Sequence, residues 1–358
     1  MDKILDTRKV DKFDKLLEGV SSIVLTCHVR PDGDAVGSTL GWMHVLESLG
    51  KSVSVVVPDN APRSLAFLPG FDRMAVFTRH EEYCEKLFRE AQLVICCDFN
   101  QPSRLDRMQH LLTDCTCPKV LIDHHVEPSS FADILFSFPE MSSTCELSFR
   151  VMAELGLYSE INLQAATCLL TGMITDTKNF TVNCKSPDIY EILQRLLEKG
   201  CDKNRIVRLA LMEKSYGAMM IEAYALSQKL EIFSEFHGSI MTLDKEECER
   251  FHYEKGDTEG IVNRPTEIRG ITFSFFLRED SDCIKVSARS IMDFPVNEMC
   301  KDIFGGGGHV MAAGAEFYGS LDECKRLLIE SFPKYAHYLK GRTEKLDYFD
   351  LQCPNKKL

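Results

Sequence analysis

The sequence predicts an α/β protein with a doubly wound, mainly parallel sheet in its first domain and a second, smaller α/β domain joined by a helical connector. Short apolar runs recur roughly every 30 to 40 residues in the N-terminal half, and segments with helical spacing separate them. This alternation requires βαβ crossovers and therefore a parallel sheet. The length of 358 residues exceeds that of one ordinary domain, which predicts two separate cores.

The elements of the first domain can be assigned in order along the chain. Pro58 ends one strand, Gly50 closes one helix, and Ser143 with Glu146 resembles a capping box that opens another. The first expected strand begins at Ile23, and the others cover 53–57, 93–97, 120–122 and 134–136. The expected helices cover 8–18, 35–49, 81–90, 104–112, 143–155 and 162–174.

The second half of the chain starts with helical spacing and then changes character near Ile232. Gly200 interrupts the helical stretch, which we interpret as helical packing followed by an interdomain connector. The expected strands cover 238–243, 270–277 and 283–288, and the expected helices cover 245–251, 296–303 and 321–331. The predicted boundaries are 1–195 for the first domain, 196–231 for the connector, 232–340 for the second domain and 341–358 for an irregular tail.

Composition limits the classes of function. The net charge of -12 argues against a broad basic face that coats long nucleic acid, although a small anionic ligand remains compatible with it. No stretch has the length of a membrane span, and the N-terminus lacks an apolar signal-peptide core, so a cytoplasmic protein without membrane contact is expected. Among 15 scattered cysteines, Cys115 and Cys117 are the only close pair with loop character; reduced thiols are favoured over a zinc site.

Carboxylates and imidazoles follow the ends of several buried runs. In an open parallel sheet these ends share one edge, where ligands bind. An isolated Asp34 could be a helix cap, and Asp32 with Gly33 is a common turn pair, so that segment alone is ambiguous. The combination favours a metal site, because ionised carboxylates are costly to bury unless they are paired or coordinated. The groups are His28, Asp32, Asp34, Asp98, Asp123, His124, His125 and Asp176.

Five carboxylates and three imidazoles exceed the ligands of a single ion, so we expect two metals with one bridging carboxylate. Mixed imidazole and carboxylate ligands suit manganese, iron or zinc better than magnesium or calcium. No Ser-His-Asp arrangement is evident, and the expected nucleophile is a water activated by the metals, which suits attack on a phosphoryl group.

These residues resemble the DHH phosphoesterase superfamily, named for the triplet that stands here as Asp123, His124 and His125. The segment 28–38 is similar to its first motif, Asp98 to its second and Asp176 with Thr177 to its fourth. The resemblance implies two divalent ions, Mn²⁺ above all, with Asp98 as the bridge, Asp123 orienting His124, and His125 facing the substrate phosphate or helping to place the attacking water. It implies that His28, Asp32 and Asp98 hold one ion and that Asp34, Asp98, His124 and Asp176 hold the other.

Two segments of the second domain, 286–290 and 305–314, resemble the DHH-associated C-terminal domain. A glycine run allows backbone N–H groups to approach an anion, a following helix N-terminus would add a favourable field, and Arg289 offers a planar fork for phosphate. Without the resemblance, the glycines could be a flexible linker and Arg289 a surface strand residue. The substrate-binding residues implied are Arg289, Ser290, Gly306, Gly307, Gly308 and His309.

The whole arrangement looks most like the nano-RNase and 3'-phosphoadenosine 5'-phosphate phosphatase group. Its implied substrates are short RNA and DNA oligonucleotides and 3'-phosphoadenosine 5'-phosphate. RecJ-like degradation of single strands, hydrolysis of pyrophosphate or polyphosphate, and a non-catalytic nucleotide sensor are the alternatives. Lys178 departs from the glycine that the family often has after Asp-Thr. The sequence does not decide whether the protein forms a homodimer.

Overall fold

The computed structural model describes residues 3–253 and 256–339, and the predicted tail 341–358 lies outside these residues. The chain divides into two compact units, one ending at Glu213 and one beginning at Lys214. The segment predicted as a connector, 196–231, is therefore shared: its first part belongs to the first unit and its last helix to the second. In the part of the chain described, no helix has the length and hydropathy needed to cross a bilayer.

The first unit contains a six-stranded sheet in the order β3-β2-β1-β4-β5-β6, and every neighbouring pair is parallel. The strand order reverses at the neighbouring pair β1 and β4, and such a reversal is where ligands bind in open α/β sheets. A doubly wound parallel sheet was predicted and is confirmed. The strands are β1 Ser22–Thr26, β2 Ser52–Val57, β3 Ala75–Val76, β4 Leu93–Cys97, β5 Lys119–Asp123 and β6 Ile134–Ser137.

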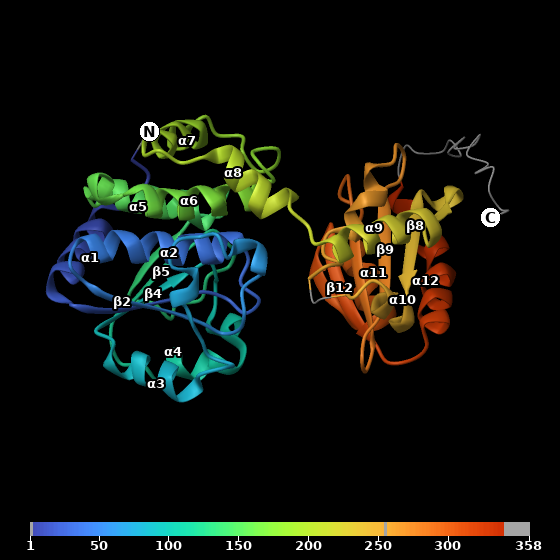
Figure 1. Ribbon diagram of the computed structural model, residues 1–358, viewed down its shortest axis with the longest axis horizontal. Coiled ribbons are helices and arrows are strands. Elements are labelled where there is room, and N and C mark those ends of the chain that lie inside the picture. Colours follow the sequence, from blue (N-terminus) through green and yellow to red (C-terminus); the bar gives the residue numbers. More distant parts are fainter. Residues whose placement is uncertain (1–2, 254–255, 340–358) are drawn as a thin grey trace. The chain divides into compact units, whose positions relative to one another are not determined.

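Helices cover both faces of this sheet (Figure 1). One face carries α1, α2, α5 and α6, with α7 packed outside them against α5 and α6, and the other face carries α3 and α4. Both faces of β1, β4 and β5 are thus buried, which explains their nearly continuous apolar runs. The helices are α1 Thr7–Gly19, α2 Gly33–Ser48, α3 Glu81–Glu90, α4 Gln109–Asp114, α5 Thr144–Glu154, α6 Leu163–Asp176, α7 Asp188–Glu198 and α8 Lys203–Val207.

Two local predictions differ from the structure. The helix expected over 104–112 is instead a 3-10 helix, Pro102–Met108, followed by α4. Ser143 does cap α5 by accepting from the N–H of Glu146, but the Glu146 carboxylate accepts from Ser142 and Arg150 rather than from the cap backbone. The capping box is therefore incomplete, because a buried arginine competes for the carboxylate.

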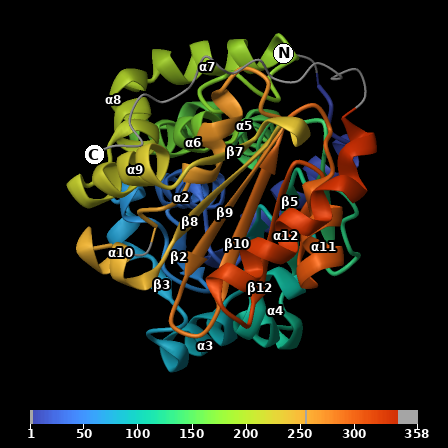
Figure 2. The same cartoon turned by 90° about the vertical axis from the view of Figure 1, so that its right-hand side faces the viewer.

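The second unit has its own six-stranded sheet, in the order β11-β12-β10-β9-β8-β7. Only the pair β8 and β9 is parallel, and Figure 2 shows these strands with β10 beside them. Helices α11 and α12 pack on one face, while α9 and α10 pack on the other. The elements are β7 Glu231–Phe233, β8 Gly238–Leu243, β9 Phe273–Glu279, β10 Ile284–Ser290, β11 Gly307–His309, β12 Ala312–Phe317, α9 Tyr216–Gln228, α10 Lys245–Arg250, α11 Val296–Phe304 and α12 Leu321–Tyr335.

The glycine run lies between a helix and a hairpin. Gly305, with a φ of 69°, ends α11 in the left-handed conformation, and β11 begins two residues later. The expectation that a helix N-terminus follows the glycines is wrong, because the next element is the β11–β12 hairpin. A glycine run suits a helix end and a closely packed strand equally well, so the sequence did not separate the two.

Candidate active site

Three of the predicted segments end at the same edge of the first sheet. His28 lies two residues after β1, Asp98 directly follows β4, and Asp123 is the last residue of β5. Asp98 has a φ of 68°, and its N–H donates to the Ile122 carbonyl at 3.1 Å. This left-handed residue turns the chain at the point where its carboxylate meets the imidazoles, and such strain is concentrated at functional sites.

Hydrogen bonds tie the three loops to one another. The Val29 N–H donates to the Arg104 carbonyl at 2.8 Å, which joins the loop after β1 to the segment after β4. Asn100 Nδ2 donates to the Val126 carbonyl at 2.8 Å, and the Asn100 carbonyl accepts from the Ser129 N–H at 2.8 Å. The sequence analysis missed Asn100 and Arg104, because their partners are backbone atoms of other loops, which leave no signature in the sequence.

Asp34 and Asp176 come from helices rather than strands. Asp34 lies in the first turn of α2, and Asp176 is the last residue of α6. The two helices approach so closely that a Cβ at Gly37 would lie 2.5 Å from the Cys168 carbonyl oxygen. Asp32, not Asp34, caps α2, since its carboxylate accepts from the N–H groups of Asp34 and Ala35 at 3.0 and 3.1 Å.

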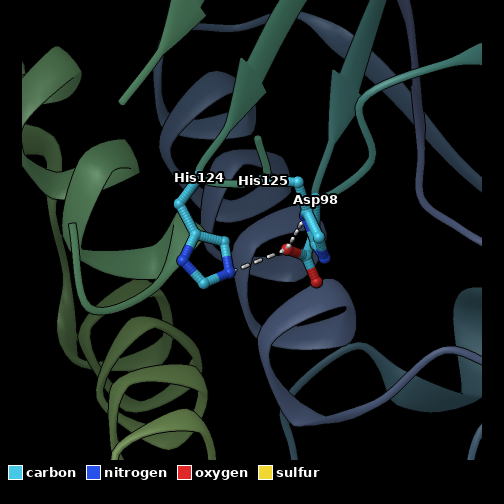
Figure 3. Close-up of side chains that lie close together, drawn as sticks. All are labelled: Asp98, His124 and His125. Carbon is cyan, nitrogen blue, oxygen red and sulfur yellow. Dashed lines mark ion pairs between the residues drawn. The ribbon is translucent and has the colours of Figure 1, made fainter. Parts of the chain in front are cut away.

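The Asp98 carboxylate lies between two imidazoles. Its Oδ2 is 3.4 Å from His28 Nε2, and its Oδ1 is 3.6 Å from His124 Nε2. His124 Nε2 also lies 3.4 Å from Asp176 Oδ2 and 3.8 Å from Asp34 Oδ2. Figure 3 shows Asp98 facing His124 and His125. Three groups have ligand atoms within 4.8 Å of one another: His28 with Asp32 and Asp98, Asp34 with His124 and Asp176, and Asp98 with His124 and His125.

Backbone carbonyls orient two of the imidazoles. His28 Nδ1 is 2.8 Å from the Val29 carbonyl oxygen, and His124 Nδ1 is 3.2 Å from that of Met141. These contacts place the proton on Nδ1 and leave Nε2 free as a ligand atom. Asp123 was predicted to orient His124, but its Oδ1 instead lies 2.7 Å from His125 Nδ1. The prediction chose the wrong imidazole, because alternate residues, not adjacent ones, share a side of an extended chain.

The N-terminus of α5 holds the Asp34 carboxylate. Its oxygens accept from the N–H groups of Thr144 and Cys145 at 2.6 and 2.9 Å, where the helix dipole favours negative charge. The Thr144 hydroxyl donates to Asp98 Oδ1 at 2.9 Å. The sequence indicated where this helix starts but not that its N-terminus binds the Asp34 carboxylate, so Thr144 and Cys145 were missed.

Burial and mutual repulsion make these carboxyls hard to ionise without a cation. Burial first, then the neighbouring Asp34 and Asp98, raise the pKa of Asp176 to about 10. The pKa of Asp98 is raised well above its ordinary value by burial and by Asp34, and burial also raises that of Asp34. Asp123 Oδ2 is buried without a hydrogen-bond partner among the described residues. Oxygen and imidazole donors crowded in this way fit divalent metal ions.

The chain beyond Asp176 has an unusual backbone. Lys178, Asn179 and Phe180 have φ angles of 46°, 57° and 61°, so three consecutive residues other than glycine are left-handed. The Asn179 N–H donates to the Ile174 carbonyl at 2.8 Å, and its side chain accepts from Lys203 at 2.6 Å. Lys178 is exposed. The family's usual glycine would adopt this conformation readily, whereas lysine must be held in it.

The substrate-binding residues expected in the second unit lie on β10 and the hairpin. Arg289 Nη1 donates to the Ala288 carbonyl at 2.8 Å, and burial lowers the pKa of its guanidinium. Ser290 Oγ donates to the Phe294 carbonyl at 2.6 Å, so its hydroxyl proton is already engaged in a hydrogen bond within the protein. His309 ends β11 and is exposed, together with Gly307 and Gly308. A Cβ at Gly306 would overlap the Gly314 carbonyl oxygen, which gives this glycine a packing role.

Comparison with known proteins agrees with both units. Residues 22–173 match the DHH family, N-terminal domain, and residues 241–334 match the DHHA1 domain. A bifunctional oligoribonuclease and PAP phosphatase NrnA of Thermus thermophilus is 30% identical over 90% of this chain and 92% of its own length.

Solved structures show the same fold. An exopolyphosphatase-related protein from Bacteroides fragilis is 40% identical, with a TM-score of 0.92 over 95% of this chain and all of its own. RecJ from Thermus thermophilus in complex with Mn²⁺ is 12% identical, with a TM-score of 0.56 over 94% of this chain and 56% of its own, which shows a shared fold. The four motifs, the two matched domains and these full-length similarities lead to one conclusion: the chain belongs to the DHH phosphoesterase family.

Proposed function

We propose that the protein is a two-metal phosphoesterase that hydrolyses very short oligonucleotides, dinucleotides above all, to mononucleotides. We also propose that it removes the 3'-phosphate of 3'-phosphoadenosine 5'-phosphate to give AMP, and that it acts in the cytoplasm. The observation that carries the proposal is the Asp98 carboxylate, whose two oxygens face different imidazoles and which belongs to two of the three ligand groups. The relative from Thermus thermophilus, whose name states both activities, supports the choice of substrates.

The proposed ligands follow from these groups. His28, Asp32 and Asp98 would hold one ion, and Asp34, Asp98, His124 and Asp176 would hold the other. Mixed imidazole and carboxylate donors suit manganese, iron or zinc, and we choose Mn²⁺ because the RecJ structure of similar fold contains this ion. Two such ions lower the pKa of a water molecule and neutralise charge on a phosphoryl group.

The protein's own side chains would bind and orient the substrate. Asp123 raises the pKa of His125 through a hydrogen bond, and Asp98 also contacts this imidazole. Held in this way, His125 would face the substrate phosphate or help to place the attacking water. In the second unit, Arg289 and the exposed His309, with Gly307 and Gly308, would bind the terminal phosphate and base of a short substrate.

The test compares turnover of a 5'-phosphorylated dinucleotide, a 20-mer and 3'-phosphoadenosine 5'-phosphate in Mn²⁺, with Asp98→Asn as control. We expect turnover of the dinucleotide and of 3'-phosphoadenosine 5'-phosphate, little of the 20-mer, and none by the variant, which loses the shared ligand. Equal cleavage of the 20-mer would favour a RecJ-like nuclease. Unchanged turnover by Asp98→Asn would refute the proposed metal site.

A further inference from the structure

The acidic ligand set poses an electrostatic problem for an anionic substrate. If ionised, the carboxylates of the site carry five negative charges, and two divalent cations would carry four positive ones. The loaded centre would therefore gain little net attraction for phosphate from its ions alone, so further cations are needed nearby. The carboxylates are Asp32, Asp34, Asp98, Asp123 and Asp176.

Arg104 is a cation held beside this centre by its own backbone. It lies in the 3-10 helix Pro102–Met108, six residues after Asp98. Its carbonyl accepts from the Val29 N–H at 2.8 Å, and the Val29 carbonyl in turn lies 2.8 Å from His28 Nδ1. The backbone of Arg104 is therefore two hydrogen bonds away from a candidate ligand.

The Arg104 side chain has no structural task among the described residues. It is exposed, and none of the hydrogen bonds or ion pairs found there involves its guanidinium. Its backbone is bonded to Val29, which lies in the same loop as His28 and Asp32, so this exposed arginine is anchored beside candidate metal ligands. An unpaired guanidinium anchored there has the charge and the planar donor fork that suit a phosphoryl group.

We propose that Arg104 contacts the scissile phosphate, as a substrate contact supplied by the first unit and distinct from Arg289 of the second. The inference rests on the proposed function and assigns a further residue to it. Because the fork would bind charge that develops on the phosphoryl oxygens, its loss should lower kcat as well as raise KM.

The test measures kcat and KM in Mn²⁺ for the full chain and for Arg104→Ala, Arg104→Lys and Arg107→Ala. Arg107 is the matched control, because it lies in the same 3-10 helix but pairs at the surface with Glu81 at 3.6 Å. We expect kcat/KM to fall about 100-fold in Arg104→Ala and about 10-fold in Arg104→Lys, with a change within about twofold in Arg107→Ala.

Two substrates locate the contact. A dinucleotide with a 5'-phosphate and one without it both contain the scissile phosphate and differ only in the terminal one, so the fold loss in Arg104→Ala should be equal for both. A loss confined to the 5'-phosphorylated substrate would place Arg104 at the terminal phosphate and overturn the inference. Loss of the Mn²⁺-induced rise in melting temperature would also overturn it, since the side chain would then be structural.

Binding of AMP to the Mn²⁺-loaded protein, followed by calorimetry, gives an arm independent of turnover. We expect weaker binding by Arg104→Ala than by the wild type. A wild type that cleaves no dinucleotide would refute the proposed function, and equal AMP binding by the wild type and Arg104→Ala would then refute a phosphate contact by Arg104 as well. A wild type that cleaves while Arg104→Ala cleaves equally well would refute only the role of Arg104.

Discussion

The side chains that follow apolar runs could be predicted from the sequence, whereas their partners could not. His28, Asp98 and His124 were candidates because burying such groups after a strand is costly without a cation. The groups that orient them are mostly backbone atoms, such as the Met141 carbonyl against His124 and the N–H of Thr144 on Asp34. Every residue carries these atoms, so only the fold reveals which ones are used.

Asp98 and Asp123 both contact His125, and substitution separates their tasks. Asp123 Oδ1 lies 2.7 Å from His125 Nδ1, whereas Asp98 Oδ1 lies 3.7 Å away. Asp123→Asn removes the charge that raises the His125 pKa. We expect kcat to fall by about 10- to 100-fold while Mn²⁺ affinity changes by less than about threefold. Steady-state kinetics and calorimetric Mn²⁺ titration measure both quantities.

The outcome of the Asp123 experiment has a clear alternative. A large loss of Mn²⁺ affinity in Asp123→Asn would make Asp123 a ligand, through the Oδ2 atom that has no partner among the described residues. Asp98→Asn is the reference for ligand loss. Melting temperatures of both variants without metal distinguish either effect from general unfolding.

At the scale of elements, helix positions were predictable but helix contacts were not. Apolar spacing and end signals placed α2 and α6 within a few residues of their observed bounds. The sequence did not show that these helices pack closely enough to bring Asp34 and Asp176 to one imidazole, because small residues mark close approach only once the partner is known. The prediction that a helix follows the glycine run was wrong for a related reason, since the sequence did not show that a strand follows instead.

The close approach of α2 and α6 can be tested with Gly37→Ala. Alanine favours a helix by about 1 kcal/mol over glycine, but its Cβ would meet the Cys168 carbonyl oxygen at 2.5 Å. A backbone atom cannot rotate away, so we expect a net destabilisation of about 1–3 kcal/mol and a weaker second metal site. Urea unfolding and Mn²⁺ titration measure these changes.

Gly19→Ala is the matched control for Gly37→Ala. Gly19 is the last residue of α1, and a Cβ there would meet no atom within 4 Å. We expect this variant to have unchanged or slightly higher stability and normal Mn²⁺ affinity. If both variants behave alike, the close contact between α2 and α6 does not determine the spacing of Asp34 and Asp176.

At the scale of the whole molecule, two separate cores were predictable from length, but the order of strands was not. Parallel crossovers are compatible with several strand orders, and the order β3-β2-β1-β4-β5-β6 places the reversal beside His28 and Asp98. The candidate metal ligands found among the described residues belong to the first unit, which has its own apolar clusters, while the second unit has others. Metal binding should therefore stabilise one unit selectively.

Metal-free protein should become less stable as the pH rises. The folded chain holds protons more tightly on Asp98 and Asp176, whose pKa values are raised, to about 10 for Asp176, whereas the unfolded chain releases them near pH 4. Stability is thus highest below the unfolded pKa and falls as the pH rises toward the folded pKa. The expected slope is about 1.4 kcal/mol per pH unit for each proton that is retained.

Mn²⁺ should reverse this dependence, because it binds the ionised carboxylates and displaces their protons. Calorimetric scans of the full chain in EDTA and in Mn²⁺, at pH 6 and pH 9, measure the effect. We expect two transitions, of which Mn²⁺ raises only that of the first unit, and by more at pH 9 than at pH 6; free Mn²⁺ at 100 times its dissociation constant contributes about 2.7 kcal/mol. An equal rise at both pH values would mean that the carboxylates are already ionised without metal, and a shift of both transitions would mean that the ligand set extends beyond the first unit.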